Sequence, residues 1–247
     1  MRNTKRIKKF CNELANIWET KCPDWRFFQL MFNVLSSMKS DPFFIEDDKA
    51  IDMFKRYFNV INDPILILMG GTASGKDTVQ KELVNYKFDK IVTYTTRPPR
   101  ENEKDKVDYN FISKDTFDSI KDYFFAETNV YHTKFGDWWY GSPINEYINA
   151  ASKKSVILTP NGVRQVVSLL EKYNKKCVIF YLYAPEEVVR KRLSQRKDDE
   201  EEVNRRIEAD KKDFSDLNGI DYYKINSDRP VNEIVEDILN IYDKNNE

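Results

Sequence analysis

The residues best suited to phosphate chemistry are a glycine-rich run that ends in a lysine. The run fits the pattern G-x-x-x-x-G-K, in which glycines let the backbone turn tightly so that successive N–H groups face one phosphate. It follows a strand-like apolar run at 65–69 and precedes a helical pattern at 78–85, and a helix N-terminus attracts the same anion. Lys76 would neutralise charge on the β- and γ-phosphates during phosphoryl transfer. The sequence therefore predicts an ATP-binding phosphate loop formed by Gly70, Gly71, Thr72, Ala73, Ser74, Gly75 and Lys76.

The residue after the lysine departs from the common pattern of such loops. Serine or threonine is usual there, and its hydroxyl ligates magnesium, whereas here Asp77 follows Lys76 and Thr78 comes next. A carboxylate is a harder oxygen ligand than a hydroxyl and can replace it. We therefore expect Asp77 and Thr78 to complete the ATP-binding segment, Mg²⁺ to be the cofactor and Asp77 to be its ligand.

A second group of residues suits the binding of a monophosphate. Arg97 and Arg100 are three residues apart, in a segment that also holds Thr93, Glu103 and Tyr109. Two guanidinium groups at this spacing can hold one phosphate through charge-assisted hydrogen bonds. A solvated, charged hairpin is the alternative interpretation.

The same segment, at 93–111, closely resembles the signature of the guanylate kinase family, T-T-R-x-x-R-x-x-E-x-x-G-x-D-Y-x-F. The spacing is kept throughout, and Lys106 stands where the family usually has glycine. The resemblance extends over residues 64–242 and includes four functional segments in the same order. It implies that the acceptor phosphate is bound by Arg97, Arg100 and Tyr109, with a hydroxyl from Thr93 and with Glu103 holding the arginines.

The resemblance also implies how the acceptor base is chosen. Glu127 and the later Tyr140-Gly141-Ser142 match the family's arrangement of a glutamate followed by Y-G-S, in which Tyr140 contacts the phosphate. A carboxylate can accept from guanine N1–H and the 2-amino group together, and Ser142 can reach O6. Adenine lacks that donor pair, so a buried glutamate would be left unpaired against it.

Two departures from the family pattern leave other bases open. The segment between Glu127 and Tyr140 is several residues longer than usual, and it contains Trp138 and Trp139, which we interpret as packing residues. Around residues 157–163, where the family commonly has an aspartate-containing segment, Thr159 and Asn161 are the polar residues.

A charged helical stretch later in the chain resembles the lid of the same family. Arg192, Arg196 and Arg206 match its R-L-x-x-R…R pattern, with one residue fewer between the last two. Such arginines would stabilise the charge that develops during transfer, while lid closure excludes water. A solvated, salt-bridged helix face is the alternative. Near the end of the chain, Asn226 matches the family's V-x-N-D segment, whose asparagine approaches the adenine of ATP.

The order of elements along the chain predicts an α/β fold. Strand-like runs at 65–69, 91–94, 155–158 and 177–182 alternate with helical patterns, which indicates a parallel sheet. With the resemblance, this predicts a P-loop NTPase core with helices on its sheet, an inserted NMP-binding subdomain and a helical lid, preceded by a small all-α segment. The expected boundaries are 1–60 for the N-terminal segment and 61–247 for the guanylate kinase-like domain, comprising core (61–91, 144–189 and 211–247), NMP-binding subdomain (92–143) and lid (190–210).

Residues 4–60 carry three stripes of apolar residues at helical spacing. Pro23 ends the first predicted helix and Asp41-Pro42 closes the second. Such faces bury against one another, against a neighbouring domain or against another subunit. We therefore expect residues 1–60 to have a structural role, or a role in docking or self-association. The stretch faintly resembles a small helical domain of phage-associated proteins, and that resemblance implies no activity.

The composition limits the partners of the chain. It has 40 basic and 41 acidic residues and a net charge of −1, so it lacks the basic excess that attracts nucleic acids or membrane surfaces. No apolar run reaches the ~18 residues that a membrane-spanning helix needs. The 3 cysteines and 1 histidine show no zinc-ligand spacing. We expect a cytoplasmic protein that binds neither nucleic acid nor membrane.

Together the motifs predict a kinase that moves the γ-phosphoryl of ATP to GMP or dGMP. One alternative is a kinase for another (d)NMP, such as a modified phage nucleotide, and the long segment after Glu127 motivates it. A second alternative is a non-catalytic interaction module of the guanylate kinase type. Such modules tend to lose the lysine of the phosphate loop, and Lys76 is present here.

Overall fold

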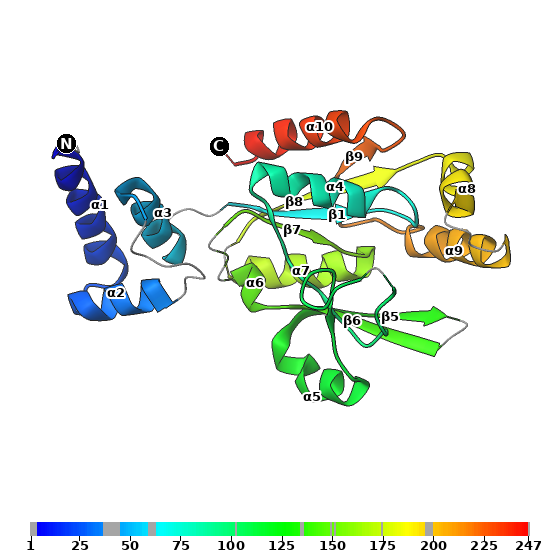
Figure 1. Cartoon of the computed structure of the whole chain (residues 1–247), viewed down its shortest axis with the longest axis horizontal. Helices are drawn as coiled ribbons and strands as arrows, with labels where there is room; N and C mark the ends of the chain where they lie inside the picture. The colour runs from blue at the N-terminus through cyan, green and yellow to red at the C-terminus, as the bar shows by residue number, and fades with distance from the viewer. Residues whose placement is uncertain are drawn as a thin grey trace. The chain divides into compact units, whose positions relative to one another are not determined.

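The computed structural model describes residues 4–36, 45–58, 63–101, 103–133, 136–148, 150, 152–173, 175–195 and 200–246. They form two compact units, Met1–Asn62 with Asn149–Ala151, and Asp63–Ile148 with Ser152–Glu247 (Figure 1). Each unit has its own set of buried apolar residues, and no buried residue belongs to both of the clusters described below.

The first unit is a small group of helices, as its three apolar stripes predict. It contains α1 (Lys5–Lys21), α2 (Phe27–Ser36) and α3 (Asp47–Tyr57). An ion pair of 2.6 Å between Lys55 Nζ and Glu13 Oε2 joins α3 to α1. The predicted end of the second helix at Asp41-Pro42 lies outside the described residues. The stripes bury against one another through Leu14, Ile17, Cys22, Leu30, Val34, Ile51 and Phe54.

The second unit is built on a five-stranded sheet in which every pair of neighbouring strands is parallel. The strand order is β2-β7-β1-β8-β9, so β1 lies in the middle. All five residues of β1 are buried, which explains its unbroken apolar sequence. The predicted parallel α/β fold is confirmed. The strands are β1 (Ile65–Met69), β2 (Asp89–Lys90), β7 (Lys154–Ile157), β8 (Cys177–Tyr183) and β9 (Tyr223–Asn226).

Helices cover both faces of this sheet (Figure 1). The helices α4 (Lys76–Leu83) and α10 (Val231–Lys244) share one buried cluster with β1, β8 and β9. Tyr242 of α10 donates a hydrogen bond of 2.7 Å from its hydroxyl to the Pro64 carbonyl, which ties α10 to the start of β1. On the other side lies α7 (Pro160–Lys172), which begins where the Thr159 hydroxyl accepts a hydrogen bond from Gly162 N–H.

A second, four-stranded sheet is inserted between β2 and β7, in the order β4-β3-β6-β5. Its strands are β3 (Tyr94–Thr95), β4 (Asn110–Phe111), β5 (Phe125–Thr133) and β6 (Gly136–Pro143), and α5 (Lys114–Phe124) leads into β5. The antiparallel pair of β5 and β6 forms its longest part, which we call the ribbon. A short helix, α6 (Asn145–Ile148), follows β6, and a turn of 3-10 helix at Val84–Tyr86 follows α4.

The predicted strand at 91–94 is wrong as a single element. β2 ends at Lys90, which pairs with Ser155 of β7, and β3 begins at Tyr94, which pairs with Asn110 of β4. The residues between them carry the chain from one sheet to the other. Ile91 is buried and the three residues after it are half-buried, but the run is divided between two sheets and forms no single strand.

Two helices stand at the end of the large sheet where β1 and β8 finish (Figure 1). They are α8 (Glu186–Gln195) and α9 (Glu200–Asp213), and charged residues make up half of α8 and most of α9. Within the part of the chain that the structure describes, no helix combines the length and the apolar character needed to cross a membrane.

Because the two units have separate cores, a fragment that starts at Asn62 should keep the fold of the second unit. We expect its thermal unfolding to be cooperative, with a midpoint within about 3 °C of the main transition of the full chain, which corresponds to less than about 1 kcal/mol. Calorimetry of the fragment and of the full chain tests this. A broad transition, or a much lower midpoint, would show that the N-terminal helices complete the larger core.

Candidate functional site

The glycine-rich run forms a loop between the end of β1 and the start of α4. Gly75 precedes α4 at φ +91°, a left-handed conformation that favours glycine. At Gly70 a side-chain carbon would overlap the Leu182 carbonyl oxygen of β8, so the loop passes that strand without room for a methyl group. The loop thus lies at the carboxyl ends of the central parallel strands, where open α/β sheets bind ligands.

The side chain of Lys76 folds over this loop. Its Nζ donates to the Gly70 carbonyl at 2.8 Å, to the Gly71 carbonyl at 2.6 Å and to Ser74 Oγ at 3.2 Å. Thr72, which follows Gly71 in the loop, donates from its N–H to Asp210 Oδ2 of α9 at 2.6 Å. Lys76 Nζ and the Thr72 N–H, two donors of the loop, thus bond to protein oxygens in this structure.

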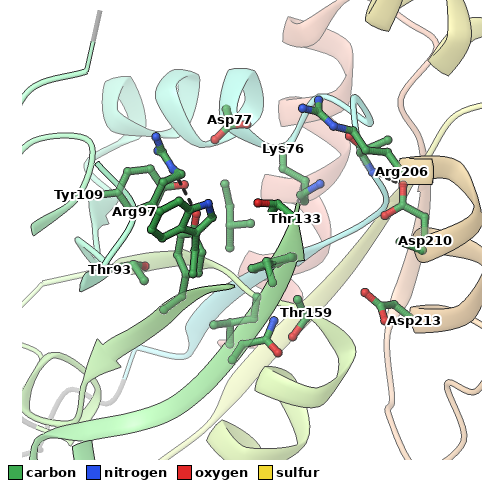
Figure 2. A pocket seen from close by; sticks show the side chains of 18 of the residues that line it. Lys76, Asp77, Thr93, Arg97, Tyr109, Thr133, Thr159, Arg206, Asp210 and Asp213 are labelled. Carbon is green, nitrogen blue, oxygen red and sulfur yellow. Dashed lines mark hydrogen bonds between the residues drawn. The ribbon is translucent and has the colours of Figure 1, made fainter. Parts of the chain in front are cut away.

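A cavity of about 890 Å³ opens in front of the loop. Figure 2 shows Asp77 and Arg97 on one side of it, with Asp210 and Asp213 of α9 on the other. The cavity is bounded by the phosphate loop, the ribbon, the end of β7 and α9. The structure brings together around it these residues that the sequence singled out: Thr72, Ala73, Lys76, Asp77, Thr93, Arg97, Arg100, Tyr109, Glu127, Tyr140 and Arg206.

Arg97 is held rigidly at the wall of this cavity. Its Nη2 donates to both carboxylate oxygens of Glu103, at 2.7 and 2.8 Å, and its Nε donates to the Tyr140 hydroxyl at 3.2 Å. Glu103 also accepts from Arg100 N–H at 2.9 Å. Burial acts to raise the pKa of Glu103, but the hydrogen bonds from Arg100 and Arg97 outweigh it and lower that pKa. Glu103 therefore stays ionised and fixes both arginine positions.

Two tyrosines complete this side of the cavity. The rings of Tyr109 and Tyr140 meet edge to face with centroids 5.9 Å apart, and the Arg97 guanidinium lies 5.5 Å from the Tyr109 centroid. Burial raises the pKa of Tyr109 to about 12. Its hydroxyl therefore stays protonated at neutral pH and remains a hydrogen-bond donor to an anion.

Glu127 of β5 lines the cavity and is nearly inaccessible, with 5% of its surface exposed. Its Oε1 accepts a hydrogen bond of 2.8 Å from Ser142 Oγ, which is 2.7 Å from the Tyr147 hydroxyl. Burial raises the pKa of Glu127 to about 7, although the bonds from Ser142 act in the opposite direction. A further hydrogen-bond donor at this carboxyl would therefore stabilise its ionised form.

Other predicted residues support the cavity instead of lining it. Arg192 donates from its two terminal nitrogens to the Ala73 carbonyl at 3.0 Å and to the Ser227 carbonyl at 2.8 Å, so it braces the phosphate loop. Asn226 Oδ1 accepts from Asp228 N–H. Arg196 lies outside the described residues. The remaining predicted residues do not line the cavity; they are Gly70, Gly71, Ser74, Gly75, Thr78, Glu103 and Ser142.

The sequence analysis missed one whole wall of the cavity. Asn129, Tyr131 and Thr133 of β5 line it, and so does Trp138, which pairs across the ribbon with Tyr131. Trp138, which we interpreted as a packing residue, thus also lines the cavity. Alternate residues of a strand face the same side, so counting in twos from Glu127 would have found the three residues of β5.

Other charged residues of the cavity were also missed, among them Lys90, Asp210 and Asp213. Lys90 lines the cavity, donates to the Asp108 carbonyl at 2.6 Å and lies 5.4 Å from the centroid of Tyr109. Burial lowers its pKa. Asp210 and Asp213 face the same cavity from α9 (Figure 2). No short-range pattern could have found them, because each meets the site through contacts between distant parts of the chain.

A phosphate loop at the carboxyl edge of a parallel sheet defines a nucleotide-binding protein of the P-loop class. Comparison with known proteins gives the family. A family model described as guanylate kinase matches residues 62–245. A guanylate kinase of Clostridium tetani is 30% identical over 180 residues, covering 72% of this chain and 84% of that protein. One of Prochlorococcus marinus is 29% identical over 180 residues, covering 72% and 95%.

The chain belongs to the guanylate kinase family, whose members are ATP-dependent nucleoside monophosphate kinases. The crystal structure of guanylate kinase from Anaplasma phagocytophilum has the same fold, with a TM-score of 0.57 and 20% identity over 75% of this chain and 87% of that one.

The buried carboxyl of Glu127 should make stability depend on pH. Its pKa is about 7 in the fold against an ordinary 4.5, so between these values the folded state binds the extra proton and stability falls as pH rises. Glu127→Gln removes this cost. We expect it to raise the free energy of unfolding at pH 8 by up to about 3 kcal/mol relative to the unchanged chain, with no gain below about pH 4.5.

Denaturant titrations from pH 4 to 9 measure this difference. Glu103→Gln is the contrasting control, because the pKa of Glu103 is lowered and its charge stabilises the fold at neutral pH. That variant should lose stability at pH 8 and lose less in acid. A difference for Glu127→Gln that is flat across pH would contradict the assigned burial of charge.

Proposed function

We propose that this protein transfers the γ-phosphoryl of ATP to GMP or dGMP, forming ADP and GDP or dGDP. One observation carries the proposal: the phosphate loop with Lys76 and the rigid Arg97–Glu103–Tyr140 cluster face the same cavity. In-line phosphoryl transfer needs a donor and an acceptor phosphate held close together, and little other chemistry from the protein.

The acceptor phosphate would bind at the arginine side of the cavity. The guanidinium groups of Arg97 and Arg100 supply charge, and the hydroxyls of Tyr109 and Tyr140 supply donors. Thr93 lines the same region (Figure 2). Since Glu103 and Tyr140 already orient the Arg97 side chain, binding would require little further ordering of that side chain.

The acceptor base would bind at Glu127. Guanine offers N1–H and a 2-amino group, two donors that stabilise the carboxylate form and so offset the cost of burying its charge. Adenine brings no such pair, which leaves the charge without a partner. The hydroxyl of Ser142 is committed to Glu127 and Tyr147, so we assign Ser142 the role of positioning Glu127.

The ATP phosphates would bind at residues 70–78. Lys76 and the lid arginines Arg192, Arg196 and Arg206 would stabilise the charge that builds up during transfer, and closure of the lid would exclude water. Asn226, at the end of β9, would approach the adenine of ATP.

Mg²⁺ is the proposed cofactor, with Asp77 as its protein ligand. Asp77 lines the cavity beside Lys76, and its carboxylate is a hard oxygen donor. The described residues contain no group of three potential ligands, which suits an ion held by one carboxylate, substrate phosphates and water. Bound Mg²⁺ would neutralise charge on the β- and γ-phosphates.

A kinase for another (d)NMP is the second candidate. The observation that favours it is the extra wall of the cavity, where Tyr131, Thr133 and Trp138 add contacts that the family signature does not include. Thr159 also lines the cavity, at the place where an acidic residue is common. These groups could accommodate a base other than guanine.

We also propose which segments of the chain form the subdomain, the lid and the core. Residues 92–143 would form the NMP-binding subdomain and 190–210 the lid, on a core made of the rest of 61–247. Residues 1–60 would serve docking or self-association in a cytoplasmic enzyme that acts on free nucleotides. Unchanged turnover by the fragment that starts at Asn62 would fit this role, and lost turnover would contradict it.

ADP release from ATP and Mg²⁺ with a panel of NMPs and dNMPs tests the reaction. We expect GMP or dGMP to exceed every other acceptor by roughly 10²-fold in kcat/KM, and Glu127→Ala to remove that preference. Lys76→Ala provides the blank. A different preferred base would leave the reaction standing and remove the role of Glu127, whereas turnover no higher than the blank would contradict the enzyme itself.

The magnesium assignment predicts a shift in metal requirement. Asp77→Ala should raise the Mg²⁺ concentration for half-maximal rate on the order of tenfold. Asp77→Ser, which restores a hydroxyl ligand, should recover part of that loss. Rates measured across a Mg²⁺ titration at fixed ATP decide the matter, and identical curves for the unchanged chain and Asp77→Ala would remove Asp77 from the metal site.

A further inference from the structure

The phosphate loop and the lid helix α9 are joined by one short contact. Asp210 Oδ2 accepts the hydrogen bond from Thr72 N–H at 2.6 Å, and the two residues are 138 positions apart in the chain. A side-chain carbon on Gly71 would lie 2.9 Å from the same oxygen. The carboxylate can therefore come this close only because residue 71 is glycine.

Asp210 occupies a backbone donor of the glycine-rich loop. In loops of this pattern the backbone N–H groups receive the phosphate oxygens of the nucleotide. A carboxylate oxygen and a phosphate oxygen are both anionic acceptors, so they compete for the same N–H group. Burial raises the pKa of Asp210, while the Thr72 N–H and the charge of Lys76 act against that rise.

We propose that Asp210 is a positioning residue that latches α9 onto the phosphate loop, and that ATP binds by displacing it from Thr72 N–H. The inference rests on the proposed function, because it assigns the loop to ATP. The latch sets the affinity for ATP and leaves the affinity for the acceptor unchanged, since the acceptor site lies on the other side of the cavity (Figure 2).

The same face of α9 supplies the group that replaces the latch. Arg206 lies four residues before Asp210, hence on the same side of the helix, and it lines the same cavity. Its Nε donates to Glu202 Oε1 at 2.7 Å. A movement of α9 by about one turn, roughly 6 Å, would exchange the carboxylate at the loop for a guanidinium. ATP phosphates repel the first and attract the second, so ATP itself would drive the exchange.

Asp210→Ala in the full chain tests the latch, with Asp213→Ala as the matched control. Asp213 is on the same helix and lines the same cavity, and its removal deletes the same charge without deleting the contact to the Thr72 N–H. The readouts are ATP affinity by calorimetry, with Mg²⁺ and with EDTA, and the steady-state KM for ATP, KM for the acceptor and kcat. Thermal unfolding checks that each variant is folded.

We expect Asp210→Ala to bind ATP about tenfold more tightly, with and without Mg²⁺, and to lower KM for ATP while KM for the acceptor is unchanged. Asp210→Asn, which keeps an uncharged acceptor, should fall between, and Asp213→Ala should stay within about twofold of the unchanged chain. Equal tightening by both alanine variants would reduce the effect to general charge and overturn the latch.

Two further results would also overturn it. Unchanged ATP affinity would show that the Asp210 contact does not compete with phosphate. Weaker binding of ATP only in the presence of Mg²⁺ would make Asp210 a metal ligand instead. Failure of the proposed function is a separate result, because then neither the unchanged chain nor Asp210→Ala would bind ATP better than Lys76→Ala does.

Discussion

The turn after β1 exists only because residue 70 has no side chain. A carbon there would overlap the Leu182 carbonyl oxygen and would lie 2.7 Å from Ser74 Oγ. The loop therefore packs directly against β8, and this contact holds the loop amides at the carboxyl edge of the sheet. The direction of α4, the position of Lys76 at its start and the contact of α9 with Thr72 all depend on this close passage.

At two places in the cavity, polar groups are held in a state that a ligand could stabilise. These groups are the Glu127 carboxyl, and Lys76 with the Thr72 N–H. Glu127 is buried with a raised pKa, so it gains from any ligand that brings donors. Lys76 and the Thr72 N–H are engaged by protein oxygens that a phosphate can replace. Arg97, in contrast, is already fixed by Glu103 and Tyr140, and needs no rearrangement.

The sequence predicted the fold, and it identified the segments around Lys76 and Arg97 that line the cavity, because both depend on local patterns. The run at 65–69 is apolar throughout as a central strand must be, and Arg97, Arg100 and Glu103 act on one another within a few residues. The ribbon wall was harder to find, because Tyr131 and Trp138 line the cavity only once β5 and β6 have paired. Asp210 could not be found at all, since nothing in a charged helical sequence says which residue meets a loop far away in the chain.

The register of the ribbon determines which residues of β5 line the cavity. Its ladder is irregular between Phe125 and Glu127, and from there it runs in regular register to Thr133 opposite Gly136. Successive residues of a strand face opposite sides, so this single irregularity determines that Glu127, Asn129, Tyr131 and Thr133 all face the cavity. The positions of Glu127 and Thr133 along the cavity are therefore fixed relative to each other by one strand, and the irregularity before Glu127 sets which residues of that strand line the cavity.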